Sequence, residues 1–143
     1  FDAKIYLRWY SSHIGTASAV TLTGTRCGFG STPAAGGWRI WECTGYLQKG
    51  VTSKSSETYS DGAFSNPVTA SITADGGDVV FVSTVGNATI PSSISNLDSG
   101  SQVTGNYSRM GYDTRGANSG SVTYSSSVGW AGGGIAAVRY YLA

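Results

Sequence analysis

Charged residues are scarce in this chain. Only 12% of its 143 residues are Asp, Glu, Lys or Arg, which is about half the share usual in soluble domains. The net charge is +1, and the nine Lys and Arg residues are scattered singly along the sequence. Proteins that bind nucleic acid usually gather such residues on one face. We therefore expect no nucleic-acid partner.

Long apolar runs are missing as well. No run approaches the roughly 20 residues that a membrane-spanning helix needs, so we expect no membrane span. Disorder is excluded on other grounds, because 40% of the residues are hydrophobic and 12% are aromatic, whereas disordered chains are poor in both. The length is that of one domain. We predict a single folded domain over residues 1–143.

Cysteine and histidine are nearly absent. Cys27, Cys43 and His13 are the only residues of these types, and they cannot form a four-ligand zinc site by themselves. We predict a disulfide between Cys27 and Cys43, with two free core thiols as the alternative; such a loop contributes about 3 kcal/mol. The chain begins with Phe1, which we interpret as a mature form after removal of a leader. A disulfide and a removed leader both favour a secreted, extracellular or cell-surface protein.

Two N-glycosylation triplets fit that compartment. They begin at Asn87 and Asn106, which are therefore candidate glycosylation sites. A chain rich in Ser, Thr and Asn also produces such triplets by chance.

What the chain has in abundance is 22 Ser, 15 Thr and 21 Gly, together with a two-residue alternation of apolar and polar side chains. This alternation is typical of half-buried strands. Residues 79–85 are apolar on both faces, which predicts a central strand. The Asp-Gly-Gly-Asp sequence at 75–78 predicts a hairpin turn before it. We predict strands over residues 1–10, 20–25, 38–47, 68–74, 79–85, 122–128 and 135–142.

Two segments do not follow this alternation. Residues 86–119 form a long stretch rich in Ser, Gly and Asn, which predicts a functional loop or a hidden short strand. Residues 53–59 could form a single helical turn. The pattern as a whole predicts an all-β fold, an antiparallel β-sandwich or jelly roll of about seven to nine strands.

No arrangement of residues indicates catalysis. His13, the only imidazole, has no acidic neighbour in sequence, and most carboxylates stand in turn sequences. Glu42 lies between Trp41 and Cys43, where pairing with an arginine explains it better than a role as an acid. No phosphate, dinucleotide or metal-binding motif is present. We expect no enzymatic activity, no cofactor and no bound metal.

Two functions remain. The first is a self-assembling structural subunit of an extracellular filament, coat or surface layer, since sparse charge lowers the repulsion between copies. The partner would be the protein itself, as a homo-oligomer or polymer, through strands at the chain ends. The candidate assembly residues are Phe1, Ala3, Ile5, Leu7 and Trp9 near the N-terminus and Val138, Tyr140 and Leu142 near the C-terminus.

The alternative function is carbohydrate binding by a lectin-like domain. Exposed aromatic rings would stack on sugars, while Asn and Asp side chains in loops would bind the hydroxyl groups. The positions of Trp38 and Trp41 differ by an odd number, so one of the two rings would face outward from a strand. The candidate ligand-binding residues are Trp38, Trp41, Tyr46, Asn96, Asp98, Tyr107 and Asp113.

Overall fold

The computed structural model describes residues 46–48, 53–55, 66–86, 89–129 and 132–142, and every regular element among them is a β-strand. Within these residues there is no helix with the length and hydropathy needed to cross a membrane. The strands are β1 (Tyr46–Gln48), β2 (Ser53–Ser55), β3 (Val68–Ala74), β4 (Val79–Gly86), β5 (Val103–Gly105), β6 (Ser108–Thr114), β7 (Gly120–Ser126) and β8 (Gly133–Leu142).

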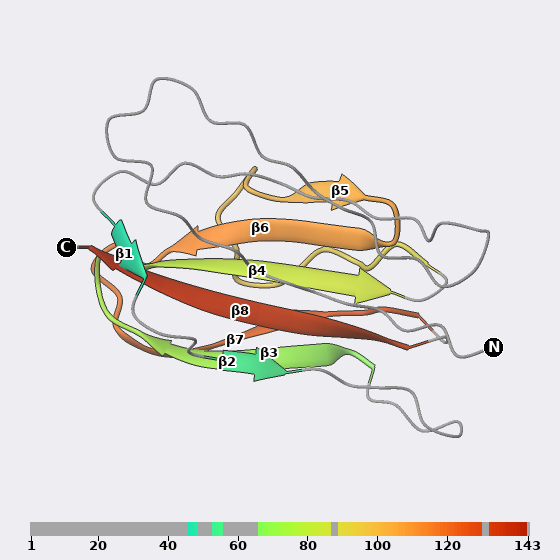
Figure 1. The fold of residues 1–143 in the computed structure, drawn as a ribbon, viewed down its shortest axis with the longest axis horizontal. Helices are drawn as coiled ribbons and strands as arrows, with labels where there is room; N and C mark the ends of the chain where they lie inside the picture. The colour runs from blue at the N-terminus through green and yellow to red at the C-terminus, as the bar shows by residue number, and fades with distance from the viewer. Residues whose placement is uncertain (1–45, 49–52, 56–65, 87–88, 130–131, 143) are drawn as a thin grey trace.

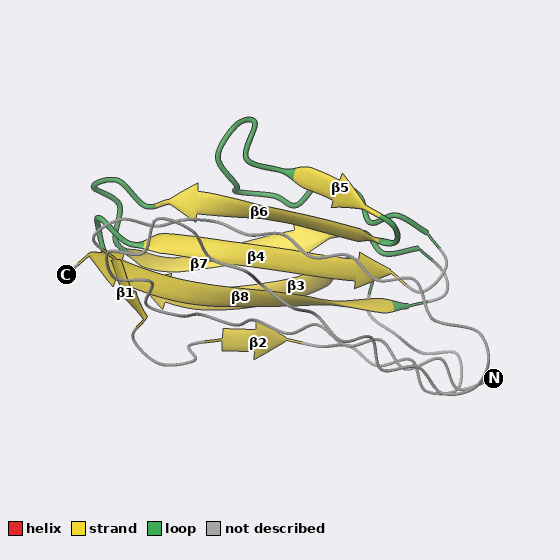
Figure 2. Cartoon of the chain, turned by 45° about the horizontal axis from the view of Figure 1, so that its top comes forward, coloured by secondary structure: helices red, strands yellow, loops and turns green. Residues whose placement is uncertain are grey.

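The strands form two antiparallel sheets, which confirms the all-β prediction for the described part of the chain. The larger sheet has the order β1-β8-β4-β6-β5, with β2 also pairing with β8. The smaller sheet consists of β3 and β7, paired from Val68↔Ser126 to Ala74↔Gly120. Figure 1 shows β5, β6, β4 and β8 in sequence across the larger sheet, and Figure 2 shows β3 and β7 behind it.

Strand β4 is the centre of the larger sheet, as its continuous apolar sequence predicts. It pairs with β8 on one side and with β6 on the other. Val80 and Val82 are fully buried in the core shared with the smaller sheet, and Phe81 is buried on the opposite face. The ring of Phe81 packs edge-on against Tyr112 and Tyr140. Both faces of this strand are therefore closed to water.

The turn at residues 75–78 does not make the predicted hairpin. Asp78 N–H donates to Asp75 O over 3.2 Å, so the chain reverses there, yet β3 and β4 belong to different sheets. The physical reason lies in the two burial patterns. Strand β4 is apolar on both faces and takes a neighbour on each side, whereas β3 buries alternate residues only and packs across the core.

Strands β5 and β6 lie inside the segment whose sequence predicts a long irregular stretch. The residues that β6 buries are small or polar, namely Ser108, Gly111 and Asp113. A pattern of buried apolar residues therefore cannot reveal this strand. The helical turn predicted at residues 53–59 is also wrong over its first part, since Ser53–Ser55 pairs with β8 as β2.

The C-terminal strand is internal rather than an edge. Residues of β8 pair with β4 from Gly133 to Tyr140, and the other side of β8 pairs with β2 and β1. Leu142 is the register partner of Tyr46. Strand β8 therefore has neighbours on both sides over most of its length. That Val138, Tyr140 and Leu142 take part in assembly stays a prediction.

The core lies between the two sheets. It is built from small and β-branched side chains together with Tyr124, which is fully buried. The members of this core are Val68, Ala70, Ile72, Ala74, Val80, Val82, Ile94, Val122, Tyr124, Val128, Ile135 and Ala137.

Candidate functional site

One end of the core is closed by charged side chains. Asp113 is 7% exposed, and its Oδ2 atom accepts a hydrogen bond from the Tyr124 hydroxyl over 2.7 Å. The same oxygen pairs with Nη1 of Arg115 at 3.1 Å. These three side chains come from the end of β6, the following turn and β7, so the carboxylate ties two sheets together. Removing it would leave a buried phenol and a largely buried cation without their partner.

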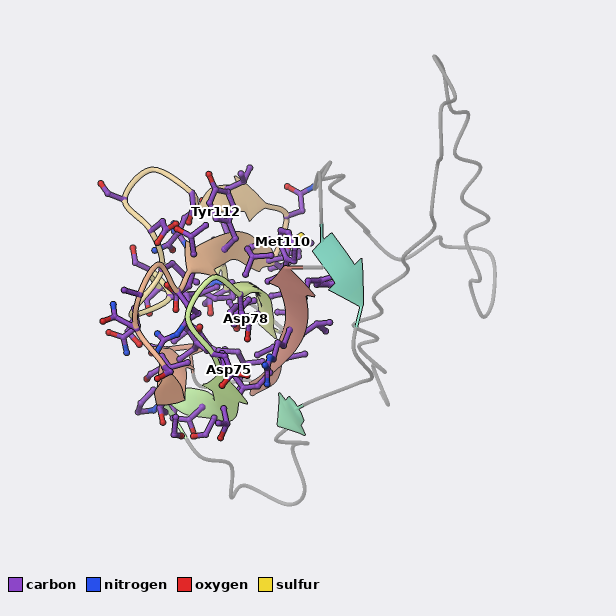
Figure 3. The ribbon with its side chains drawn as sticks, turned by 90° about the vertical axis from the view of Figure 1, so that its left-hand side faces the viewer. Asp75, Asp78, Met110 and Tyr112 are labelled. Atoms are coloured by element: carbon purple, nitrogen blue, oxygen red, sulfur yellow. The ribbon has the colours of Figure 1, made fainter. Side chains whose placement is uncertain are left out.

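A second ionic contact closes the same end. Arg139, on β8, pairs with Asp75 and with Asp78 in the turn between β3 and β4. Asp78 is 3% exposed, and its Oδ2 also accepts the Asp75 N–H over 2.6 Å. Seen from this end, Asp75 and Asp78 lie close together at the tip of the strands (Figure 3). We call Asp75, Asp78, Asp113, Arg115, Tyr124 and Arg139 the charged cluster.

The charged cluster shifts the titration of two of its members. Burial and the hydrogen bond to Asp113 raise the pKa of Tyr124 above its ordinary value, so the phenol stays protonated. For Arg139, burial acts to lower the pKa, but the hydrogen bond and charge of Asp75 and the charge of Asp78 outweigh it and raise the pKa. Both groups are therefore fixed in a single protonation state at neutral pH.

The chemistry of the charged cluster is structural. Its carboxylates all bind arginines, and no His, Cys or Lys belongs to it. The described part of the chain holds no group of three or more His, Cys, Asp or Glu side chains that could bind a metal ion. An Asp–Arg pair of this kind closes the end of a core without leaving an acid or a base for a substrate.

The second notable feature is a strap, which we define as residues 91–102. Its first half lies along the outer edge of β7. Ser92 N–H donates to Ser127 O and Ser95 N–H donates to Ser125 O, over 2.8 and 2.9 Å. The hydroxyl oxygens of the same two strap serines accept the N–H groups of Ser127 and Ser125, over 2.8 and 2.9 Å. Two serines thus bind the strand edge in the way that a neighbouring strand would.

The second half of the strap covers β6. Asp98 N–H donates to Tyr112 O over 3.0 Å, and the Asp98 carboxylate accepts the Thr114 N–H over 3.0 Å. Ser101 Oγ donates to the same Tyr112 carbonyl over 2.9 Å. Leu97 packs so closely on β6 that a Cβ on Gly111 would lie 2.6 Å from it. The strap therefore bridges β7 of the smaller sheet and β6 of the larger one.

Two further contacts fix the strap. Ile94 is 2% exposed and belongs to the core. The side-chain amide of Gln102 accepts the Ile94 N–H and donates to the Ile94 carbonyl, each over 2.9 Å. The sequence marks Ile94 and Leu97 only as isolated apolar residues. The hydroxyl groups that bind the edges follow no period, so sequence patterning could not find them.

Three of the candidate ligand-binding residues belong to the charged cluster or to the strap. Asp113 belongs to the charged cluster, and Asp98 caps β6. Asn96 has a φ of 60° and donates from its side-chain amide to Thr123 O over 2.8 Å. One polar atom of each of these side chains is therefore already bonded within the chain.

Tyr107 is an aromatic candidate that is open to solvent. It is 46% exposed, in the turn between β5 and β6, and its φ of 57° lies in the left-handed region. Its carbonyl accepts the Gly86 N–H over 2.8 Å. Asn106, the neighbouring candidate glycosylation site, is also exposed. Both residues therefore stand at the tip of a hairpin.

The outer face of the smaller sheet bears hydroxyl groups only. Alternate residues of β3 and β7 point away from the core there, and they are exposed or half-exposed. Ser71 Oγ and Thr123 Oγ1 are 2.8 Å apart across the two strands. We call this surface the hydroxyl face, and its residues are Thr69, Ser71, Thr73, Ser121, Thr123 and Ser125.

Several predictions fall outside the described residues. Tyr46 lies in β1, but its side chain is not described. The others are Cys27, Cys43, Trp38, Trp41, Asn87 and the N-terminal candidates Phe1, Ala3, Ile5, Leu7 and Trp9.

Comparison of the chain with models of protein families, with curated proteins and with solved structures gives no match.

Proposed function

We propose that this protein is a non-catalytic structural subunit that assembles with copies of itself into an extracellular filament, coat or surface layer. In this proposal the two sheets are the layers of a β-sandwich. The core shared by β3, β4, β7 and β8 supports that arrangement. The disulfide and the secreted location are part of the same proposal.

The observation that carries the proposal is the placement of charge. The charged side chains that the structure describes bond to partners within the chain. Arg109, for example, donates from Nε to Pro91 O over 3.1 Å. Charge that is paired within the chain gives little protection against self-association, because like-charge repulsion between copies is what keeps monomers apart.

The hydroxyl face supports the same function. Six hydroxyl-bearing side chains on two paired strands form a surface without charge or large apolar groups. Such a surface is wettable, so it keeps a single subunit soluble. It also lets a neighbour approach without desolvating a charge, which is the costly step in bringing polar surfaces together.

The test is the assembly state of the full-length protein. We expect regular polymers or sheets in negative-stain images and a concentration-dependent mass in light scattering. Intact mass with and without reductant would report the disulfide in the same sample. A protein that stays monomeric at every concentration would contradict the proposal.

Carbohydrate binding is the second candidate, and Tyr107 supports it. A non-glycine residue with positive φ is strained, and Tyr107 has this conformation at an exposed position next to the exposed Asn106. Aromatic stacking with an adjacent amide is a usual way to bind a sugar ring. A glycan array with the Tyr107→Ala variant as control tests this function. Binding that survives the substitution would exclude the hairpin tip as the site.

A further inference from the structure

The outer edge of β7 has two halves that differ in their bonding. Ser125 and Ser127 have both backbone groups bonded to the strap. Backbone groups of alternate residues point to the same edge of a strand, so those of Thr123 and Ser121 point outward too. Among the described residues, the Thr123 carbonyl is bonded to Asn96, whereas its N–H and the outward groups of Ser121 have no hydrogen bond. The strap therefore covers only half of this edge.

The edge of β7 also lacks the usual protection of an exposed strand. Edge strands in natural proteins carry Lys, Pro or inward charges that prevent pairing with another chain. Residues 117–129 contain no charged residue and no proline. The other edge that the strap covers, on β6, differs in this respect because Arg109, Asp113 and Arg115 lie on it or beside it. Of these two edges, β7 is the one that a second strand can approach without repulsion.

We infer that the outer edge of β7 is the docking edge for a second copy of this chain, and that Ser92 and Ser95 of the strap limit how much of it is available. This inference rests on the proposed function, since it names the surface through which copies would meet. The two copies of β7 pair antiparallel about a twofold axis, so each contributes the same edge.

The choice of a second copy follows from what the edge can accept. A partner strand must supply backbone groups opposite Ser121 and Thr123, and it must be neutral to match an uncharged stretch. Strand β7 itself meets both conditions, because it alternates small hydroxyl residues with Val122 and Tyr124. Pairing through backbone groups leaves the hydroxyl face open for further neighbours.

The test compares four variants of the full-length chain with the unaltered protein, using sedimentation velocity over a range of concentrations. Ser92→Ala with Ser95→Ala removes the two hydroxyl acceptors and leaves the N–H groups of Ser125 and Ser127 unpaired. The backbone N–H groups of Ser92 and Ser95 still bind the Ser127 and Ser125 carbonyls, so the strap is weakened rather than removed. We expect self-association to tighten by up to about tenfold, because a strand from a second copy then competes better with the strap for this edge. Ser93→Ala is the matched control, since the Ser93 side chain makes no bond to β7 in the described structure.

The third variant, Thr123→Pro, blocks the edge directly. The Thr123 N–H points away from β3, so proline there removes a donor for the partner and keeps the pairing with β3. We expect it to weaken association about tenfold or more. Thr123→Ala is its control, because it removes only the hydroxyl group and leaves the edge intact.

The outcomes separate this inference from the proposed function. If the unaltered protein and Thr123→Pro assemble equally well, the docking edge is wrong and the proposed function stands. If only the Ser92/Ser95 variant assembles, native assembly fails. The docking edge then stands if a fifth variant, which adds Thr123→Pro to the Ser92/Ser95 substitutions, no longer assembles, and it is wrong if that variant still assembles. If no form assembles, both fail.

Hydrogen exchange provides a second measurement in case the double variant does not fold. In the unaltered protein, we expect the Thr123 and Ser121 amides to become more protected as the protein concentration rises. Protection that is independent of concentration would overturn the docking edge.

Discussion

The charged cluster and the hydroxyl face contrast most clearly in this molecule. The cluster places Asp78 and Asp113 at 3% and 7% exposure, whereas the face presents six uncharged hydroxyl residues to solvent. This reverses the common arrangement in which charges cover the surface and hydroxyl groups make local bonds. Within the described residues, the surface therefore carries less charge than the composition suggests, because Asp78 and Asp113 close the core. The predictions below test this difference between the two regions.

The largest effect is expected from Asp113→Ala. It removes the shared partner of Tyr124 and Arg115, which leaves a buried hydroxyl and a largely buried cation unpaired. We expect a loss of about 3–5 kcal/mol in the free energy of unfolding. Thr123→Ala on the hydroxyl face is the control and is expected to change stability by about 0.5 kcal/mol or less. Urea denaturation measures the free energy of unfolding of both variants. Equal losses would show that the charged cluster contributes no more to stability than the hydroxyl face.

The next effect concerns Tyr124→Phe, which keeps the ring and removes the hydroxyl group. We expect a loss of about 1–2 kcal/mol at neutral pH, because Asp113 then keeps only its bond to Arg115. The pKa of Tyr124 is raised in the folded state, so its contribution is complete below the unfolded pKa of about 10 and declines above it. The difference in the free energy of unfolding between the unaltered protein and Tyr124→Phe should therefore narrow as the pH rises above about 10. A difference that stays constant with alkaline pH would contradict the role of this phenol.

A smaller effect, of opposite sign, is expected at the hairpin tip. Tyr107→Gly relieves a positive φ at a half-exposed position, and it should raise the free energy of unfolding by about 1 kcal/mol. Thermal unfolding would detect this gain. Tyr107→Ala removes the ring without relieving the backbone, so it should not be stabilising; stabilisation by both variants would show that the ring, not the backbone, is unfavourable.

The smallest effect on stability is expected on the hydroxyl face, where assembly is the property that should respond. Ser71→Lys with Thr69→Lys adds two charges to exposed positions of β3. We expect a change in stability of about 0.5 kcal/mol or less, since the side chains point to solvent. If neighbours pack on this face, the variant should associate more weakly at low salt and recover at high salt. Unchanged association would place the contacts elsewhere.

The sequence predicts part of this fold well, and the reasons are physical. Strands β3, β4, β7 and β8 carry alternating or continuous apolar residues, and these apolar positions are the ones that the fold buries. For the segment that holds β6, the sequence predicts either a functional loop or a hidden short strand. It does not locate the strand, because Asp113 and Gly111 face inward there, and polar or absent side chains give no apolar signal. The sheet partner of β3 was also wrong, since a tight turn fixes a chain reversal but not a pairing.

The candidate site residues show a similar division. Asn96, Asp98 and Asp113 were selected as polar loop residues, and they do have specific partners. Those partners are backbone groups and side chains of this chain, which only the three-dimensional arrangement reveals. Tyr107 was selected for its aromatic ring, and its exposed position at a hairpin tip keeps it a candidate.

The most direct test of the central claim is sedimentation of the unaltered protein at several concentrations, from about 0.05 to 0.5 M salt, a range that shortens the screening length severalfold. An uncharged docking edge and an uncharged hydroxyl face predict assembly that grows with concentration and hardly changes with salt. A protein that remains monomeric throughout, or that assembles only when salt screens its charges, would contradict the account.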